Sequence, residues 1–205
     1  MAGIVQRLGI LGGTFDPIHH GHLVAAEEAH YQLDLDLVLF VPAGLPPHKP
    51  SRPVSPASHR LRMVELAIAG KPYFALCRVD VDRPGPSYTV EMLDLLRLEW
   101  GPGPTFFFIV GTDSLAEMTT WYQHQRLMQL CELAVVARTG VEVDLSRLEK
   151  QLPGLEDHLH WVRMPQLEIS SSGLRSRVQA GRPISYLVPP AVEAYIREQS
   201  LYRDR

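Results

Sequence analysis

The sequence has few lysines and cysteines, and it contains no long apolar run. Only three of its 20 basic residues are lysines, and no block of like charge occurs in a chain whose net charge is −3. Such a charge pattern does not favour a nucleic-acid or membrane partner. No apolar run approaches the roughly 20 residues that cross a bilayer, and residues 1–6 lack the apolar region of a secretory signal. The two cysteines, Cys77 and Cys131, have no C-x-x-C partner, so two buried thiols in a reducing cytoplasm are expected.

Two common nucleotide-binding motifs are also missing. The chain contains neither G-x-G-x-x-G nor G-x-x-x-x-G-K-[ST], which disfavours a dehydrogenase fold and a P-loop kinase. It contains no repeat and no low-complexity tract. Its 205 residues, 45 % of them hydrophobic, suit one domain over 1–205 whose last part, from about 170 to 205, is helical.

Segments typical of strands alternate with segments typical of helices. Strands are predicted at 4–11, 37–42, 74–79, 105–110, 133–137 and 158–164. Helices are predicted at 21–33, 59–69, 88–100, 114–130, 171–180 and 190–199, together with a short one in the polar stretch 141–155. Ser55 and Ser87 are expected to cap the second and third helices. This alternation predicts an α/β fold: a Rossmann-like, doubly wound, mainly parallel sheet with helices on both faces.

The segment 12–22 lies on the turn between the first predicted strand and the first predicted helix. In open α/β sheets this is where nucleotides bind, at helix N-termini beyond the carboxyl ends of strands. Gly12 and Gly13 allow a ligand to approach the backbone, and His19 and His22 bring two imidazoles together. One well-placed donor to a charge that grows in the transition state contributes about 3 kcal/mol. The turn is therefore suited to a reacting polyphosphate.

The residues of this turn also fit two other interpretations. One is a structural Asp16-Pro17 turn that carries surface histidines. The other is a metal site built from Asp16, His19, His20 and His22. The histidines lack the i, i+4 spacing of a helical zinc site and no cysteine is nearby, so both interpretations are disfavoured.

The segment 12–22 matches the G-x-F-D-P-x-H-x-G-H signature of the HxGH nucleotidyltransferases. From about Leu8 to Tyr202 the chain resembles one branch of them, the bacterial nicotinate mononucleotide adenylyltransferases of NAD synthesis. Further matching segments are Pro46-Pro47-His48-Lys49, Pro86-Ser87-Tyr88-Thr89, Gly111-Thr112-Asp113, Trp121-Tyr122 and Ile169-Ser170-Ser171-Ser172-Gly173-Leu174-Arg175. The resemblance implies transfer of the adenylyl group of ATP, with Mg²⁺, to nicotinate mononucleotide.

The resemblance also implies which residues bind. Those expected at ATP are Gly12, Gly13, Thr14, Phe15, His19, His22, Gly111, Asp113, Ser171, Ser172 and Arg175, with His19 and His22 as the catalytic pair. Arg138 is a further candidate for the triphosphate, because it comes just after a predicted strand. Those expected at the mononucleotide are His48, Lys49, Thr89, Trp121 and Tyr122, and no protein-held metal is expected. Ser172 replaces a usual threonine but keeps the hydroxyl, whereas Gly173 costs about 1 kcal/mol against alanine in a helix.

Each of these segments has a plainer interpretation. The segment 46–49 delivers two cationic groups on a rigid proline pair, but it also fits an exposed loop. Asp113 suits ribose hydroxyls or an N-cap, and the serines at 170–172 suit an anion site or an ordinary cap. Trp121 suits a pyridine ring, where stacking is worth about 1–3 kcal/mol, or a packed core. A helix that began at Trp121 would offer N–H groups to a ring carboxylate.

Other functions remain open at the level of sequence. Within the class, the acceptor could be nicotinamide mononucleotide or phosphopantetheine. Outside it, the chain could be a non-catalytic nucleotide sensor or a metal-binding protein. The loops at 43–56 and 111–122 are expected to close over the substrates. The sequence leaves the oligomeric state open, a homo-oligomer included.

Overall fold

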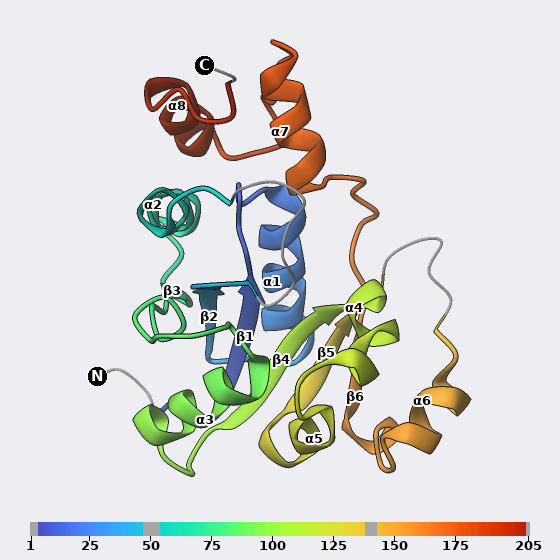
Figure 1. Ribbon diagram of the computed structural model, residues 1–205. Helices are drawn as coiled ribbons and strands as arrows, with labels where there is room; N and C mark the ends of the chain where they lie inside the picture. The colour runs from blue at the N-terminus through green and yellow to red at the C-terminus, as the bar shows by residue number, and fades with distance from the viewer. Residues whose placement is uncertain (1–3, 47–53, 138–142, 204–205) are drawn as a thin grey trace.

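The structure is a computed structural model that describes residues 4–46, 54–137 and 143–203. Its centre is a six-stranded sheet of order β3-β2-β1-β4-β5-β6 in which every pair is parallel (Figure 1). The strands are β1 (Arg7–Gly13), β2 (Leu37–Pro42), β3 (Phe74–Leu76), β4 (Thr105–Gly111), β5 (Glu132–Val136) and β6 (Leu159–Val162). The predicted Rossmann-like fold is confirmed, with a sheet that is wholly rather than mainly parallel.

Eight α-helices are present in the described part of the chain. They are α1 (His20–Gln32), α2 (Ala57–Ile68), α3 (Thr89–Trp100), α4 (Thr112–Ala116), α5 (Leu127–Leu130), α6 (Leu145–Gln151), α7 (Ser171–Gln179) and α8 (Pro190–Glu198). Short 3-10 turns lie at η1 (Met118–Thr120), η2 (His124–Arg126) and η3 (Glu156–His158). In Figure 1, α7 and α8 lie at the top of the view, and α8 contacts α2 below it.

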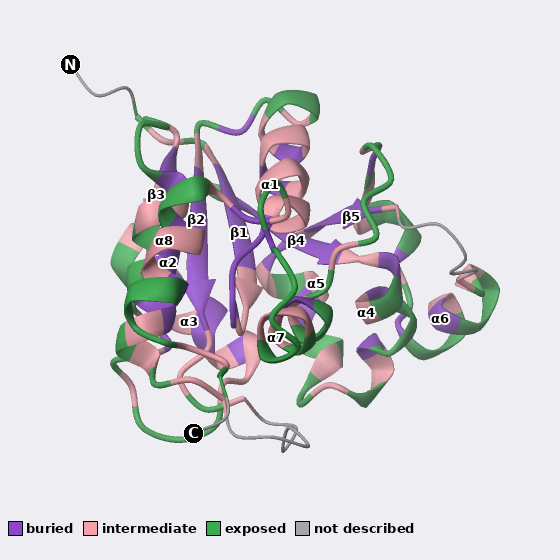
Figure 2. Ribbon diagram, turned by 90° about the horizontal axis from the view of Figure 1, so that it is seen from above, coloured by how far each residue is buried: buried purple, intermediate pink, exposed green. Residues whose placement is uncertain are grey.

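Successive strand residues alternate between two apolar clusters on opposite faces of the sheet. Phe40 and Ile109 belong to one cluster, with side chains from α1, α2, α7 and α8. Leu39 and Phe108 belong to the other, with side chains from α3 to α6. Figure 2 shows the strands as the buried centre, with half-buried and exposed helices around it. Burial on both faces is why these strands are nearly continuous runs of Val, Leu, Ile and Phe.

The topology creates one point where the connections diverge. β1 pairs with β2 on one side and with β4 on the other. The loops after Gly13 and Gly111 therefore leave the same edge of the sheet in opposite directions. Crevices at such switch points are where open α/β folds bind ligands. The fold thus brings the segments 12–22 and 111–113 together.

Several local predictions are wrong. β3 is only three residues long, because the chain turns back at Arg78, whose carbonyl accepts the amides of residues 81 and 82. The region 114–130 is not one or two helices but a succession of short turns and helices. Ser87 does not cap α3, since its Oγ accepts the Leu45 amide at 3.0 Å. Ser55 does not cap α2, which begins after Pro56 without a side-chain cap.

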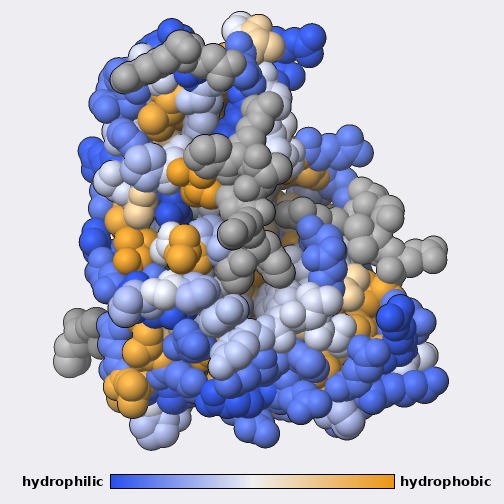
Figure 3. All heavy atoms as spheres, viewed as in Figure 1, coloured by the Kyte–Doolittle hydropathy of each residue, from blue (hydrophilic) through white to orange (hydrophobic). Residues whose placement is uncertain are grey.

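Other predictions hold only in part or are not tested by the structure. Cys131 is buried, but Cys77 is only half-buried. The single-domain organisation stays a prediction, although α7 and α8 share the first apolar cluster with α1 and α2. No helix in the described ranges is long and apolar enough to cross a membrane. On the face shown in Figure 3, apolar residues form separate patches among polar ones.

Candidate active site

The loop after β1 is packed from beneath by an aromatic side chain. Phe15 has a left-handed backbone (φ 51°) and a buried ring that contacts Phe40 and the edge of His22. A Cβ on Gly13 would lie 3.2 Å from the Phe15 ring. Glycine at this position therefore lets the ring fill the space under the loop. Since the Phe15 side chain is in the core, any ATP contact from this residue must come from its main chain.

The two signature histidines form a stacked pair. Their ring centroids are 3.7 Å apart at an interplanar angle of 25°. The backbone N–H of His19 donates to Nδ1 of His22 at 3.3 Å. Because Nδ1 accepts this bond, the neutral His22 ring carries its proton on Nε2 and can donate from there. His19 is 2 % exposed, so the alternative of a surface turn with exposed histidines is wrong.

The signature glycine between the histidines has a steric reason. A Cβ on Gly21 would lie 3.0 Å from Nδ1 and 3.1 Å from Cε1 of His19. Such separations are shorter than a side chain accepts without moving the ring. Gly21 therefore permits the stack of His19 on His22.

A cavity of about 380 Å³ opens beside this loop. It is lined by His22 and Gly21 from α1, by the end of β4 up to Gly111, and by the segment 164–170 between β6 and α7. Its size suits a nucleoside or another small ligand. Sequence reasoning gave no role to residues 164–168, because a segment without strand or helix periodicity carries no local signal.

The N-terminus of α7 is docked on the histidine loop. Ser171 Oγ donates to the Pro17 carbonyl at 2.9 Å, and Arg175 Nη1 donates to the Asp16 carbonyl at 2.7 Å. Ser170, not Ser171, is the N-cap, and its Oγ accepts the Gly173 amide at 3.1 Å. The glycine at position 173 makes room for this cap, because a Cβ on Gly173 would lie 3.0 Å from the Ser170 Oγ.

Asp113 lies close to the switch point but is not a cap. Gly111 ends β4, lines the cavity and is itself the N-cap of α4. Asp113 is exposed in the first turn of α4. The N-cap interpretation of Asp113 is therefore wrong, and its carboxylate lies within one turn of the cavity lining.

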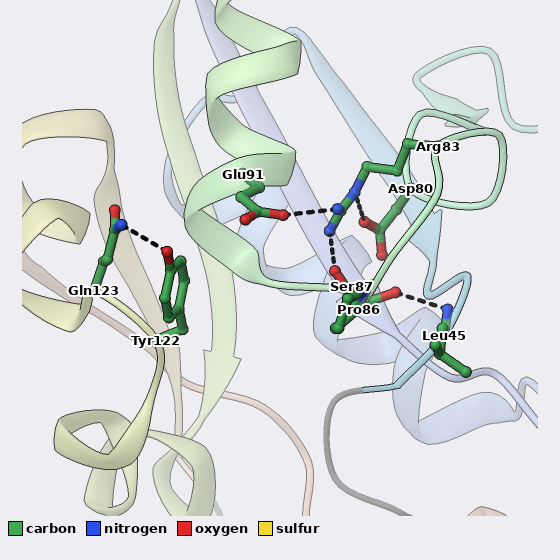
Figure 4. Close-up of polar contacts among 8 residues, drawn as sticks. All are labelled: Leu45, Asp80, Arg83, Pro86, Ser87, Glu91, Tyr122 and Gln123. Atoms are coloured by element: carbon green, nitrogen blue, oxygen red, sulfur yellow. Dashed lines mark hydrogen bonds and ion pairs between the residues drawn. The ribbon is translucent and has the colours of Figure 1, made fainter.

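The segment before Thr89 is held as a rigid unit at the start of α3. Arg83 donates to Asp80 at 2.7 Å, to Glu91 at 2.8 Å and to the Pro86 carbonyl at 2.6 Å (Figure 4). The Ser87 amide donates to the Leu45 carbonyl at 2.8 Å. Two hydrogen bonds thus join the loop after β2 to the loop that leads into α3.

Trp121 and Tyr122 lie beside that unit but do not begin a helix. Trp121 ends η1, and its amide donates to the Met118 carbonyl at 3.0 Å. The predicted carboxylate site at a helix start is therefore wrong. The Trp121 ring is half-buried with its edge toward Phe108, and Tyr122 stacks on Tyr88 at 4.4 Å. This stack places Tyr122 against Tyr88, the residue that precedes Thr89.

Three expected site residues, His48, Lys49 and Arg138, lie outside the described residues. Within the described ranges, no group of three or more His, Cys, Asp or Glu side chains is placed to hold a metal ion. The structure thus gives the metal-site alternative no support.

Sequence reasoning missed a buried polar contact beneath the histidine loop. Asp16 Oδ1 accepts the hydroxyl of Tyr202 at 2.6 Å, and Oδ2 accepts the Ser55 amide at 3.1 Å. Burial and the adjacent Asp16 carboxylate both raise the pKa of Tyr202. The phenol therefore stays neutral and acts as a donor. Nothing local in the sequence links residues that are 186 positions apart.

Comparison with known proteins identifies the family of this chain. The cytidylyltransferase-like family matches residues 10–177. A probable nicotinate-nucleotide adenylyltransferase from Thermomicrobium roseum is 49 % identical over 199 residues, covering 97 % of this chain and 92 % of the relative. One from Moorella thermoacetica is 45 % identical over 203 residues, covering 97 % and 93 %.

A solved structure agrees in fold. The Plasmodium falciparum nicotinic acid mononucleotide adenylyltransferase complexed with NaAD has a TM-score of 0.78 at 21 % identity, and the match covers 96 % of this chain and 97 % of that one. The histidine loop at the sheet's switch point and the near full-length similarity lead to one conclusion. The chain belongs to the cytidylyltransferase-like family and, within it, to the nicotinate-nucleotide adenylyltransferases.

Proposed function

We propose that this chain transfers the adenylyl group of ATP to nicotinate mononucleotide, giving nicotinate adenine dinucleotide and pyrophosphate. The observation that carries the proposal is the stacked His19–His22 pair beside a cavity at the switch point. Its context is a chain 49 % identical to a probable enzyme of this kind. A sensor of nucleotides would need no such pair of donors where charge develops.

The reaction needs no covalent enzyme intermediate. An oxygen of the mononucleotide 5′-phosphate forms a bond to the α-phosphorus of ATP. The bond from that phosphorus to the bridging β-phosphate oxygen breaks, and pyrophosphate leaves with the electron pair. The attacking phosphate is already an anion, so the protein's tasks are to align the two substrates and to stabilise charge on the leaving group.

On the ATP side, the proposal assigns charge stabilisation to the histidine pair and to the α7 N-terminus. Nε2–H of His22 donates to phosphate oxygens, with His19 as its partner in the pair. Ser172, whose side chain is exposed, and the N-terminal amides of α7 serve the β- and γ-phosphates. Ser171 and Arg175 hold α7 against the loop through the Asp16 and Pro17 carbonyls, which supports a phosphate site at this junction.

The remaining ATP contacts are assigned to the switch point. The main chain of Gly12, Gly13, Thr14 and Phe15 borders the phosphates, and Gly111 borders the cavity for the adenosine part. Asp113 accepts ribose hydroxyls. Arg138 is proposed at the triphosphate because it comes just after a strand predicted from the sequence.

On the acceptor side, the proposal assigns the mononucleotide to Thr89, Trp121 and Tyr122, with His48 and Lys49. The Tyr88–Tyr122 stack and the Leu45–Ser87 hydrogen bonds support this assignment, because they hold Leu45, the segment of Thr89 and Tyr122 together. An aromatic ring of the ligand would stack on Trp121.

Mg²⁺ fits this site as a companion of the triphosphate. Mg²⁺ is commonly held by substrate phosphates with only one or two protein carboxylates, and the described residues offer no cage of their own. When bound, the ion neutralises charge on the phosphate oxygens. A cytoplasmic location stays a prediction, and the oligomeric state stays open.

A product assay tests the proposal. Purified protein is given ATP and Mg²⁺ with nicotinate or nicotinamide mononucleotide in parallel, and the dinucleotide is measured by chromatography. Dinucleotide formed mainly from nicotinate supports the proposal. Equal yields keep the chemistry but remove the selectivity, and no product from either substrate contradicts the proposal and directs the test to phosphopantetheine.

A further inference from the structure

One arginine of α2 is buried among apolar residues and bonded to main-chain carbonyls. Arg60 is 2 % exposed and lies between apolar residues of the helix. Its Nε donates to the Ser55 carbonyl at 3.0 Å, and its Nη1 donates to the carbonyls of Ala43 at 2.7 Å and Thr14 at 3.0 Å. Nη2 lies 3.4 Å from the Gly44 carbonyl.

These carbonyls belong to three separate parts of the chain. Thr14 is in the histidine loop, Ala43 and Gly44 come directly after β2, and Ser55 comes directly before α2. One guanidinium therefore joins the two ends of the 43–56 segment to each other and to the histidine loop. Ser55 is held on its other side too, because its amide donates to Asp16.

The stretch after β2 also contacts the loop that leads into α3, on the side proposed for the acceptor. A Cβ on Gly44 would collide with the Asp80 carbonyl oxygen, so this stretch lies directly on the loop that Arg83 clamps. The next residue, Leu45, exchanges two hydrogen bonds with Ser87. From Arg60 to the segment of Thr89 there is thus a continuous series of contacts.

Arginine is suited to this place by its geometry. Its planar fork supplies several donors in fixed directions, whereas the lysine ammonium is a single point on a flexible stem. Burial lowers the pKa of Arg60, but a guanidinium stays charged in proteins. Its hydrogen bonds to the carbonyls are therefore maintained across the working pH range.

We infer that Arg60 is a positioning residue for the acceptor: it sets the stretch 43–46, and through Leu45 and Ser87 the segment of Thr89, relative to the histidine loop. The inference rests on the proposed function for the identity of the acceptor. It assigns Arg60 no contact with substrate.

The test compares two arginine-to-lysine variants in steady-state kinetics with each substrate varied in turn. Arg97 is the matched control, because it also donates to three carbonyls (Gly101, Pro104 and Leu130) but at the opposite edge of the sheet. Arg60→Lys should raise the KM for nicotinate mononucleotide about tenfold, the low end of the stability that one internal hydrogen bond from a charged donor gives to the acceptor segment. The KM for ATP should change less than about threefold by the same measure. Arg97→Lys should leave both KM values unchanged.

The outcomes separate the inference from a structural role and from the proposed function. Equal changes of KM in the two variants, or a wild-type mononucleotide KM in Arg60→Lys, would overturn the inference. If Arg60→Lys does not fold, Ser87→Ala replaces it. That variant removes one link of the same series and should raise the same KM, and an unchanged value would equally overturn the inference. A wild-type protein that forms no dinucleotide would instead contradict the proposed function.

Discussion

Substituting Gly21 by alanine perturbs the histidine pair without removing either histidine. The new methyl group would lie 3.0 Å from Nδ1 and 3.1 Å from Cε1 of His19. The backbone of Gly21 does not need glycine, because it lies in the first turn of α1 and its φ is not in the left-handed region. The His19 ring must therefore move away from the stacked position at 3.7 Å from His22.

The expected loss can be bounded from both sides. Complete loss of one donor to a transition-state charge costs about 10²–10³ in kcat. Displacement of a ring by a few tenths of an ångström costs less, so a fall of about 10- to 100-fold is expected. Stability should not fall in parallel, because alanine is favoured over glycine in a helix by up to about 1 kcal/mol.

The assay is the kcat for dinucleotide formation together with a thermal melt. Gly103→Ala is the matched control, since a Cβ there meets nothing within 4 Å, and it should leave kcat unchanged. A Gly21→Ala enzyme with wild-type kcat would refute the steric account of the signature glycine. A fall in kcat that merely follows a loss of folded protein would refute it too.

Three other predictions follow from the same structure. Replacing His22 by alanine should lower kcat by about 10²–10³ through the lost Nε2–H donor, while the circular dichroism spectrum and melting temperature stay near wild type; near-normal turnover would contradict the assigned role. Burial raises the pKa of Cys131 to about 12, so at pH 8 its thiol should resist a disulfide reagent until the protein unfolds; reaction at the rate of a free thiol in the native state would show that the site opens. Two backbone amides at the start of β1 lower the pKa of Asp36, so its contribution to stability is present above its unfolded pKa of about 3.9 and is lost as the pH falls through the folded value. Asp36→Asn should therefore lose less stability than wild type between pH 5 and about pH 2 in urea titrations, and parallel curves would contradict this.

The parts of the fold that the sequence predicts are those encoded locally. β4 is a run of consecutive buried residues, 106–110, and its pattern needs no knowledge of its neighbours. The histidine loop is also continuous in the chain, so its glycines and histidines can be assigned together. Their placement at the switch point follows once the strands are known to be parallel.

The parts that were predicted wrongly depend on partners distant in the chain or on single backbone angles. Ser87 looks like a cap, but its partner Leu45 is 42 positions away. The expected helix at Trp121 does not form, because Gln123 adopts a left-handed conformation (φ 50°). A glutamine in the sequence gives no indication of such a conformation. Arg60 was missed because an arginine within an apolar helix face has no local partner to reveal its role.

The signature of this family extends far beyond the histidine loop, and the carbonyls of that loop give a reason. Two of them accept from side chains of α7: Asp16 from Arg175 and Pro17 from Ser171. A carbonyl held by a protein donor has a fixed direction and cannot turn its negative end toward an incoming phosphate. The loop then needs little reorganisation when charge develops, which is the condition for electrostatic stabilisation to accelerate a reaction. Arg175, which is 159 positions downstream of Asp16, is thus as much a part of the proposed phosphate site as the loop itself.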